Sequence, residues 1–402
     1  MQSLDADIAI AGGGVAGLSA ACAFGAAGFS VICIDPAPPV TAEAEEGADL
    51  RTTAFLQPAR ALLERAGLWA RLEPHAAALQ VMRIVDAGGQ GHEAREIADF
   101  DAAEISGMPF GWNLPNWLLR REMLARIETL GSVAFLPGIG ATGLITRGDA
   151  ALLRLSDGRR LRARLLLAAD GRDSLIRRAL GIGVRTWRYG QKALAFSVSH
   201  PRPHENVSTE IHRSGGPFTL VPLPDLDGTP RSAVVWMERG PRIAALAALP
   251  VAEFEAEMTA RSAALFGPLK LLGRRTVWPI ISQRAQRLVG QRSALIAEAA
   301  HVVPPIGAQG LNMSLKDIAT LLDLATAAPG EIGSPEMLAR YQRRRLPDIL
   351  ARVKGIDLLN RSAMAEAAPL RELRRQGLNA IHRIMPLRRA LMQAGLGARP
   401  LS

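Results

Sequence analysis

Residues 5–36, which read DADIAIAGGGVAGLSAACAFGAAGFSVICIDP, decide the fold of this chain. The apolar run Ile8–Ala11 predicts a short buried strand, and GGGVAG at 12–17 predicts a tight turn. Small and apolar residues over 18–27 favour a helix, and residues 29–34 read as a second buried strand. This order of strand, glycine turn, helix and strand is typical of the first βαβ unit of a nucleotide-binding sheet.

The residues at the turn and after the second strand point to a dinucleotide. Gly12 permits the tight turn, Gly14 lets the backbone approach a pyrophosphate, and Gly17 lets helix and strand pack closely. The helix N-terminus offers free N–H groups to phosphates. Asp35 follows at the offset of about 20 residues expected for the acid that binds a ribose diol. We therefore interpret the stretch as a dinucleotide site and not as a glycine-rich turn without a ligand.

Length and composition set broad limits. A chain of 402 residues, 48% of them hydrophobic, can form two or three packed units. No apolar run reaches the ~20 residues that span a bilayer, and the chain starts on the first strand without a signal-peptide pattern. We expect a cytoplasmic protein. The two cysteines, Cys22 and Cys33, stand at apolar positions, which indicates buried hydrophobic residues and neither a disulfide nor a metal site.

The net charge of +10 is unevenly distributed. From Glu366 onward the chain is predicted to be helical and basic, with two glutamates against seven arginines: Arg371, Arg374, Arg375, Arg383, Arg388, Arg389 and Arg399. No nucleic-acid recognition motif accompanies this region, so we expect no nucleic-acid partner. An anionic membrane surface or an acidic protein partner fits the charge, and a solvated helical face packed on the rest of the protein is the alternative.

The middle of the chain predicts sheets. Residues 181–278 contain several strand-like runs separated by proline and glycine, with one helix from about Val251 to Phe266. A second GxGxxG match at Gly138–Gly143 is followed by alternating residues with a turn at Asp157-Gly158, which predicts a hairpin. Because no helix follows it, we reject this match as a nucleotide site. A helix ending near Trp69 is expected after Arg51–Ala54.

Three motifs in order carry a resemblance to a known family: GGGVAG at 12–17, ADGRDSLIRRALGI at 169–182 and EAAHVVPPIGAQGLNMSLKDIATL at 298–321. The chain resembles the single-component FAD-dependent aromatic hydroxylases, in particular the branch that hydroxylates the ring of ubiquinone precursors. RTTAFLQPARALLERAGLW at 51–69 and PFGWNLPN at 109–116 are also similar to that branch. The resemblance covers essentially the whole chain.

The resemblance implies an α/β fold, with a Rossmann-like FAD-binding domain, an inserted antiparallel-sheet substrate domain and a helical C-terminal tail. We expect the FAD-binding domain to comprise residues 1–76, 101–180 and 279–333. The substrate domain would comprise 77–100 and 181–278, and the helical region 334–402.

The resemblance also implies the cofactor contacts. By this likeness Gly12, Gly14, Gly17 and Asp35 hold the ADP half of FAD, and Arg51 and Asn116 lie on the flavin or pyrophosphate side. Asp170 and Gly171 match a motif that serves both FAD and the reduced pyridine nucleotide. The loop at 304–312 is expected to lie against the flavin ring, where N–H groups at a helix start stabilise the negative charge of the reduced flavin. The further cofactor-binding residues expected there are Glu298, Pro305, Gln309, Gly310, Leu311 and Asn312.

One place departs from the family pattern. The third motif of most relatives begins Gly-Asp, whereas this chain has Ala297-Glu298. The charge is kept on an arm that is longer by one carbon–carbon bond, roughly 1.5 Å. We expect Glu298 to remain a cofactor ligand with altered geometry.

The chemistry expected from the resemblance is a hydroxylation in four steps. NADPH or NADH reduces the flavin, the reduced flavin adds O₂ to give a C4a-hydroperoxide, the distal oxygen passes to a phenolic ring, and water leaves. The protein must orient the ring and exclude water. No catalytic acid or base is identified, and Pro305 and His301 are the weak candidates. His301 either acts as a base or simply packs as part of its loop.

The substrate is expected to be a small molecule, a prenylated phenol, with apolar strand residues either lining its cavity or forming ordinary core: Phe196, Val198, Phe218, Leu220 and Leu223. A basic tail that reaches the inner face of the membrane would suit such a substrate. Three alternatives remain open: an aromatic hydroxylase of another phenol, a flavin-dependent lipid reductase, and a non-catalytic partner in a biosynthetic assembly.

Overall fold

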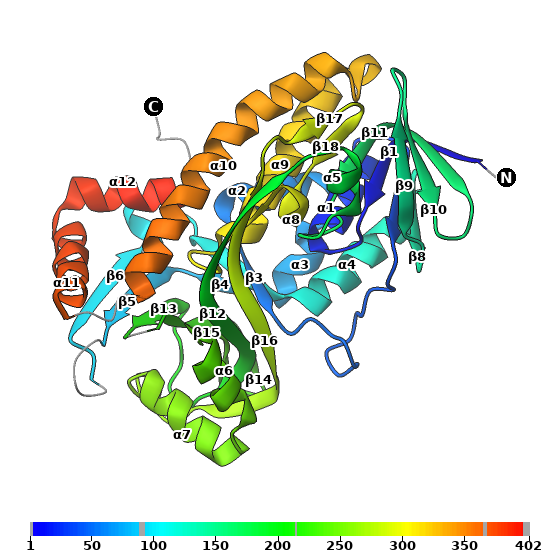
Figure 1. Cartoon of the computed structure of the whole chain (residues 1–402). Coiled ribbons are helices and arrows are strands. Elements are labelled where there is room, and N and C mark those ends of the chain that lie inside the picture. The colour runs from blue at the N-terminus through cyan, green and yellow to red at the C-terminus, as the bar shows by residue number, and fades with distance from the viewer. Residues whose placement is uncertain (1–2, 88–92, 214, 365–367, 397–402) are drawn as a thin grey trace.

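The computed structural model describes residues 3–87, 93–213, 215–364 and 368–396. It contains two large sheets, one mostly parallel and one mostly antiparallel, with helices packed on both (Figure 1). The α/β class and the helical C-terminal region expected from the sequence are confirmed. The domain boundaries stay a prediction, although β5 (Val81–Asp86) and β6 (Glu96–Asp101) do pair into the antiparallel sheet, as the division expects.

The parallel sheet is built around the first strand. Strand β1 (Ser3–Ala11) pairs in parallel with β2 (Val31–Asp35) on one side and with β11 (Arg160–Ala168) on the other. Helix α1 (Val15–Ala26) connects β1 to β2, as predicted. The sheet continues through two short strands at one end and one at the other: β18 (Ser293–Leu295), β17 (Val289–Gly290) and β8 (Val133–Pro137). Cys22 and Cys33 lie buried in this core, and burial raises the pKa of the Cys22 thiol to about 12.

The rejected GxGxxG match leads into a strand and not into a helix. Strand β9 (Ala141–Thr146) begins within it and pairs with β10 (Ala151–Leu155), which forms a hairpin with β11 around Asp157-Gly158. Gly158 has a φ of +85°, the left-handed conformation that such a turn requires. The predicted hairpin is therefore confirmed.

The antiparallel sheet has two long central strands, β12 (Val184–Ser199) and β16 (Lys270–Ala285). The others are β13 (Val207–His212), β14 (Pro217–Leu226), β15 (Thr229–Arg239), β5, β6 and β19 (His301–Val302). Helices α6 (Gly240–Ala248) and α7 (Val251–Arg261) cover one face of this sheet.

The alternation of side chains along these strands decides a question that the sequence left open. Phe196, Val198, Phe218 and Leu220 point to the face covered by α6 and α7, where Phe196 packs edge-on against Phe254. They form core and do not line a cavity beside the flavin loop, which corrects that interpretation. Leu223 is buried but lies outside this cluster.

The opposite face of the same sheet is turned toward the nucleotide-binding half. Ala193 on β12 and Met237 on β15 belong to the same buried cluster as Ile306 of the predicted flavin loop. Since neighbouring residues of a strand point to opposite faces, the odd-numbered positions of β12 and β15 around Ala193 and Met237 lie on the face away from α6 and α7.

A third sheet of three short strands lies between these parts: β3 (Thr52–Leu56), β7 (Gly111–Pro115) and β4 (Ala77–Leu79). The expected helix ending near Trp69 starts later than predicted because β3 pairs with β7 over all five of its residues. The helices around this sheet are α2 (Gln57–Arg65), α3 (Trp69–Leu72), α4 (Asn116–Glu128), η1 (Glu73–His75) and η2 (Ala102–Glu104).

Helices dominate the last third of the chain. Helix α9 (Gln309–Ala327) follows the predicted flavin loop, and the 30-residue α10 (Pro335–Met364) crosses the molecule diagonally in Figure 1. Helices α11 (Ala368–Arg383) and α12 (Met385–Leu396) gather near the C-terminal end of α10. The remaining short helices are α5 (Leu175–Ala179), α8 (Ala297–Ala300) and η3 (Pro329–Glu331). Within the described ranges, no helix is both long and apolar enough to cross a membrane.

Candidate functional site

The glycine turn lies at the carboxyl end of β1, and each glycine has a separate steric reason. Gly12 has a φ of +111°, and a Cβ there would lie 2.3 Å from the carbonyl oxygen of Ala169. A Cβ on Gly17 would lie 1.8 Å from the carbonyl oxygen of Gly12. A Cβ on Gly14 would meet nothing within 4 Å, so this glycine borders open space. The turn therefore packs tightly on the protein side and leaves room on the ligand side, as a pyrophosphate site requires.

Asp35 closes β2 beside the same turn. One carboxylate oxygen accepts a hydrogen bond of 2.5 Å from the Gly13 N–H, and the other accepts one of 2.8 Å from the Ala37 N–H. Helix α1 begins at Gly14 without a side-chain cap, which leaves its first N–H groups available. The acid and the uncapped helix start are thus brought to one edge of the sheet, where α/β folds bind dinucleotides.

The second motif lies directly against the first, since the Gly12 position packs on Ala169 and on the Asp170 N–H. The Asp170 carboxylate accepts hydrogen bonds from Ser174 Oγ at 2.5 Å and from the Ile176 N–H at 3.1 Å, which secures the start of α5. Gly171 has a φ of +80° and open space around its Cβ position. The side chain of Asp170 thus holds the turn, and the turn presents backbone to the site.

Arg51 and Asn116 meet at a carboxylate that the sequence reading missed. Arg51 forms a two-point ion pair with Asp49, with N–O distances of 2.7 and 2.8 Å, and Asn116 Nδ2 donates to the same carboxylate at 3.0 Å. Burial alone would raise the pKa of Asp49, but the hydrogen bonds and charge of Arg51 hold that pKa below its usual value. Arg51 also lies 4.0 Å from the centre of the Trp278 ring, so it joins the two halves of the molecule.

The predicted flavin loop is fixed to β3 by Asn312. Its Nδ2 donates to the carbonyl oxygens of Ala54 (2.8 Å) and Ala308 (2.6 Å), and its Oδ1 accepts from the Leu56 N–H (2.9 Å). Helix α9 begins after Ala308 without a side-chain cap. The side chain of Asn312 therefore positions the loop, and the free N–H groups at the start of α9 remain for a ligand.

The side chain of Gln309 is directed toward the C-terminal helices. Its Nε2 donates to the carbonyl oxygens of Gly307 and Gly395, and its Oε1 accepts from Arg352 of α10. Pro305 and Gly310 are exposed and Leu311 is half-buried, and a Cβ on Gly310 would meet nothing within 4 Å. The loop thus presents small and flat surfaces outward, as a site for a planar ring requires.

His301 is part of a buried ionic cluster beneath the loop. Its Nε2 lies 2.7 Å from Asp317 Oδ2, and Arg345 Nε donates to Asp317 Oδ1 at 2.7 Å. Arg345 also contacts Asp348 at 2.5 Å. Burial would raise the pKa of Asp317, but the charges of Arg345 and His301 hold it below its usual value. This cluster ties β19, α9 and α10 together, so the packing alternative describes His301 better than the general-base alternative.

The replacement of the family's Gly-Asp by Ala297-Glu298 puts a residue with a Cβ in a strained backbone conformation. Ala297 has a φ of +54°, a left-handed conformation that favours glycine. Its N–H donates to Asp317 Oδ2 at 3.3 Å, which helps to hold this conformation. Glu298 is exposed at the start of α8, and its charge contributes to a raised pKa of Arg51. Glu298 therefore lies on the same side of the site as Arg51.

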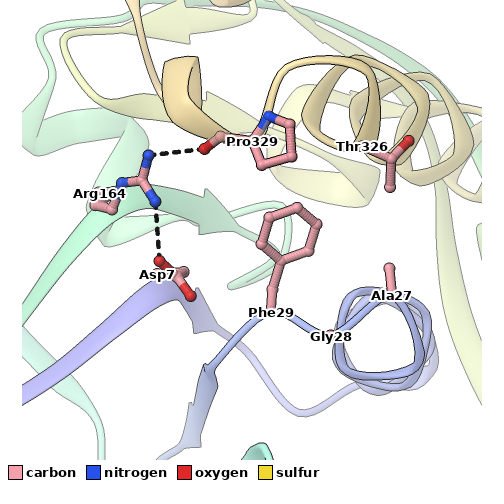
Figure 2. A pocket seen from close by; sticks show the side chains of 7 residues that line it. All are labelled: Asp7, Ala27, Gly28, Phe29, Arg164, Thr326 and Pro329. Carbon is pink, nitrogen blue, oxygen red and sulfur yellow. Dashed lines mark hydrogen bonds and ion pairs between the residues drawn. The ribbon is translucent and has the colours of Figure 1, made fainter.

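A cavity of about 340 Å³ lies elsewhere and does not belong to this site (Figure 2). It is lined by Asp7, Ala27, Gly28, Phe29, Arg164, Thr326 and Pro329. Arg164 contacts Asp7 at 3.1 Å and donates to the Pro329 carbonyl at 2.8 Å. Asp7 lies five residues before Gly12 on β1, roughly 16 Å away along an extended strand. Arg164 therefore ties strands and loop together at the edge opposite the glycine turn.

The structure brings the glycine turn, Asp35 and Asp170-Gly171 together at the carboxyl ends of β1, β2 and β11. Asn312 joins the predicted flavin loop to β3, Arg51 and Asn116 meet at Asp49, and Gln309 is directed toward the C-terminal helices. The residues that the sequence reading missed are Asp49, Asp317 and Arg345. Asp49 carried a weak signal, since it is an acid two residues before a predicted arginine. Asp317 and Arg345 lie within helices whose sequence shows no sign of their pairing. Across the described ranges, no group of three His, Cys, Asp or Glu side chains is placed to bind a metal ion.

Comparisons with known proteins agree with this geometry. Residues 5–354 match the model of the family described as FAD binding domain. The chain is 36% identical to the ubiquinone hydroxylase UbiL of Rhodospirillum rubrum over 395 residues, covering 98% of this chain and 90% of that protein. It is 29% identical to the 3-demethoxyubiquinol 3-hydroxylase of Escherichia coli, covering 99% and 100%.

Solved structures share the fold at low sequence identity. The p-nitrophenol 4-monooxygenase of Pseudomonas putida superposes with a TM-score of 0.80 at 19% identity over the whole of both chains. PqsL of Pseudomonas aeruginosa, in complex with 2-aminobenzoylacetate, superposes with a TM-score of 0.76 at 23% identity, covering 94% of this chain and 100% of that one.

Proposed function

The chain belongs to the family of proteins that share this FAD-binding domain, and from that premise we propose that it is an FAD-dependent monooxygenase that hydroxylates the aromatic ring of a prenylated phenol in ubiquinone biosynthesis. The observation that carries the proposal is the contact between two of the motifs at the carboxyl ends of β1 and β11, where Gly12 packs on Ala169 and on the Asp170 N–H. The uncapped start of α9 supports it with free N–H groups for the ring end of the cofactor. The relatives named as ubiquinone hydroxylases support the substrate class.

The residues present fit FAD. Gly14, Gly171 and Gly310 all border open space, so a ligand can approach the backbone at each of the three motifs. Gly12, Gly14, Gly17 and Asp35 would bind the ADP half, and Arg51 and Asn116 would hold the middle of the cofactor. Pro305, Gly310 and Leu311 would contact the ring. Glu298 would face the cofactor from the Arg51 side, and the side chains of Gln309 and Asn312 would fix the loop that holds it.

Bound FAD supplies the redox chemistry, taking electrons from NADPH or NADH and activating O₂ for transfer to the phenol. The chain contributes orientation and exclusion of water. The N–H groups at the start of α9 favour negative charge on the bound ring. The sheet face that carries Ala193 and Met237, opposite the face covered by α6 and α7, would hold the phenol against the loop. Excluding water there keeps the activated oxygen for the substrate.

Oxygen use tests the reaction. We expect the purified protein to be yellow and to consume one O₂ and one NADPH for each hydroxylated product, with a mass gain of one oxygen atom. A flavin-dependent lipid reductase would form product without O₂. A protein that stays colourless after FAD is added would be a non-catalytic partner, and the proposal would be wrong.

Genetics tests the substrate. A strain lacking this chain should accumulate a ubiquinone precursor that is one ring hydroxyl short. The accumulated lipid then identifies the position that the enzyme hydroxylates. Normal ubiquinone together with an accumulated unrelated phenol would instead favour an aromatic hydroxylase of another pathway.

The location follows from the substrate class. A prenylated phenol resides in a membrane, so we propose a cytoplasmic enzyme that works at the inner face of that membrane. The basic C-terminal region is the part of the chain that would meet it. Of its seven arginines, Arg399 lies outside the described residues, as do the side chains of Arg371 and Arg374.

A further inference from the structure

Helix α12 presents apolar side chains on the face that it turns to solvent. Ile384, just before the helix, and Leu387 and Leu391 within it are 51%, 41% and 44% exposed. Their spacing of three and then four residues puts them on one side of a helix. A surface helix of a globular protein normally turns polar residues outward. The outward face of α12 is therefore unusual, and we call Ile384, Leu387 and Leu391 the α12 stripe.

Another face of α12 is docked on the protein. Met392 is buried in a cluster with Ala98 and Phe100 of β6. Arg388 donates to the Asp99 carbonyl at 2.7 Å and pairs with Glu104. The helix is thus held on β6 by its inner face, and that docking directs the stripe outward.

The charged side chains along the stripe itself, from Arg383 to the end of α12, are all arginines. Arg383 precedes the stripe, and Arg389 lies on the polar side of the helix, roughly 160° around its axis from Leu387 and Leu391. Both arginines are exposed. From Leu373 to the end of the chain there is no aspartate or glutamate. Other arginines of the region are used internally, since Arg375 pairs with Glu372 and Glu96. The electrostatic partner of this face is therefore an anionic surface.

A neighbouring helix adds to the apolar surface at this end of the molecule. Near the end of α10, Leu358 and Leu359 are 70% and 57% exposed. Figure 1 shows the C-terminal end of α10 together with α11 and α12 at the same end of the molecule. Exposed leucines and isoleucine flanked by arginines are the composition of a helix that lies in the interface of a bilayer.

We propose that α12 is an interfacial membrane-binding helix, in which Ile384, Leu387 and Leu391 insert between lipids while Arg383 and Arg389 pair with anionic headgroups. The chemistry of the occupant is an anionic phospholipid bilayer. A folded protein partner would need a matching acidic and apolar groove, whereas a bilayer supplies both features along the whole length of the helix.

The inner end of α12 connects this surface to the candidate site. The carbonyl oxygen of Gly395 accepts a hydrogen bond of 3.1 Å from Gln309, the first residue of α9. Arg352 of α10 donates to the same glutamine. A bilayer bound at the stripe would therefore lie one helix away from the predicted flavin loop. The link between membrane and flavin loop rests on the proposed function, because only a prenylated phenol substrate would need a short path from the lipid to the flavin.

Vesicle flotation of the full-length, FAD-loaded protein tests the proposal. The probes are neutral phosphatidylcholine vesicles and vesicles that contain 30% phosphatidylglycerol, a fraction of roughly one anionic lipid in three that matches the proposed electrostatic partner. We expect wild type to bind the anionic vesicles at least tenfold more tightly than the neutral ones. L387E/L391E should lose at least tenfold in binding to anionic vesicles, and R383Q/R389Q should lose the preference for anionic lipid.

The matched control carries the same change at exposed apolar positions far from α12. Ile145 on β9 and Leu226 on β14 are 57% and 53% exposed, so I145E/L226E should bind vesicles as wild type does. Retained flavin absorbance and an unchanged melting temperature show that each variant is folded. Vesicle binding by L387E/L391E equal to that of the control would overturn the proposal, as would a wild type that binds neither kind of vesicle, in which case a protein partner covers the stripe.

The two proposals fail in different ways. If the stripe binds membranes but no prenylated phenol is hydroxylated, the proposed function is wrong and the membrane face stands. If hydroxylation of a short-chain soluble phenol is normal while wild type ignores vesicles, the membrane face is wrong and the function stands. With both correct, L387E/L391E should keep full activity on the soluble phenol and lose severalfold on a prenylated phenol embedded in vesicles.

Discussion

The two ends of the proposed FAD site are built in opposite ways. At the dinucleotide end, the Cβ position of Gly17 packs on the Gly12 carbonyl oxygen and Asp35 bonds to the Gly13 N–H, all within one βαβ unit. The exception is Gly12, which packs on Ala169 of the second motif. At the ring end, Asn312 bonds to Ala54, 258 residues away. Arg345 likewise reaches Asp317 across 28 residues from another helix. One end is a local motif, whereas the other is assembled by tertiary packing.

We expect the largest loss of stability when the tertiary contacts of the ring end are broken in the buried cluster under the flavin loop. In Asp317→Ala, both Arg345 and His301 would be left buried without their shared carboxylate. We expect a loss of about 3–5 kcal/mol in the free energy of unfolding, because His301 loses its carboxylate and Arg345 keeps only the partly exposed Asp348 as its ionic partner. Denaturant unfolding followed by fluorescence measures it.

Asp323 on the same helix provides the matched control. It pairs with Arg65 at 2.8 Å, but both side chains are about half exposed. Asp323→Ala should cost at most about 1 kcal/mol, as is usual for surface ion pairs. If the two variants differed by less than that amount, the ring end would not depend on its buried cluster.

This contrast also explains what could be predicted from the sequence. The βαβ unit, the hairpin at Asp157-Gly158 and the helix after the flavin loop follow from local periodicity and glycine positions, and all three are confirmed. The pairing of Asp317 with His301 and Arg345 depends on how α9 and α10 pack, for which no local pattern exists. The same holds for Phe196 and Phe218, since period-two alternation shows that a strand has two faces but not which face meets the flavin loop.

Two glycines of the turn should affect different properties: Gly17 the stability of the apoprotein, and Gly14 the affinity for FAD. Gly17→Ala would place a Cβ 1.8 Å from the Gly12 carbonyl oxygen, so the apoprotein should lose about 1–3 kcal/mol of stability through overpacking. Gly14→Ala meets no protein atom within 4 Å, and the apoprotein should change by only about 0.5 kcal/mol. FAD affinity should nevertheless fall about tenfold or more in Gly14→Ala, because the methyl group enters the space proposed for the pyrophosphate.

Titration of the FAD-free and FAD-loaded forms, with thermal unfolding, measures both effects for each variant. Gly131→Ala, between α4 and β8, is the control for the loss of a glycine, since its Cβ also meets no atom within 4 Å and its φ is not left-handed. Unchanged FAD affinity in Gly14→Ala would show that the pyrophosphate does not bind at this turn.

Acid should weaken the ring end through Asp348. Burial would raise the pKa of this carboxyl, but the hydrogen bond and charge of Arg345 lower it to about 2 from its ordinary 3.8. A depressed pKa in the folded state adds stability above pH 3.8, and that stability is lost as the pH falls toward 2. The contribution should be about 1–2 kcal/mol, less than the full shift implies because Asp348 is partly open to solvent.

The Asp348→Asn variant should therefore be less stable than wild type at pH 6 and should lose less stability between pH 4 and pH 2. Unfolding free energies across that range, with Asp323→Asn run in parallel, separate this carboxyl from the general effect of acid. If Asp348→Asn lost as much unfolding free energy between pH 4 and pH 2 as wild type does, other carboxyls would be responsible for the sensitivity to acid.

The smallest effect is expected where the ring end departs from the family pattern. Ala297 adopts a left-handed φ of +54°, which costs a residue with a Cβ about 1–2 kcal/mol relative to glycine. Glycine also makes the unfolded chain more flexible, which lowers the free energy of unfolding by about 0.4–1 kcal/mol and offsets part of this gain. Ala297→Gly should therefore stabilise the protein by about 0.5 kcal/mol. This is the reverse of the usual effect, because glycine in a helix normally destabilises a protein. Ala300→Gly, at the other end of α8, is the matched control and should destabilise. A destabilised Ala297→Gly would mean that the added flexibility of the unfolded chain outweighs the relief of the left-handed backbone at this position.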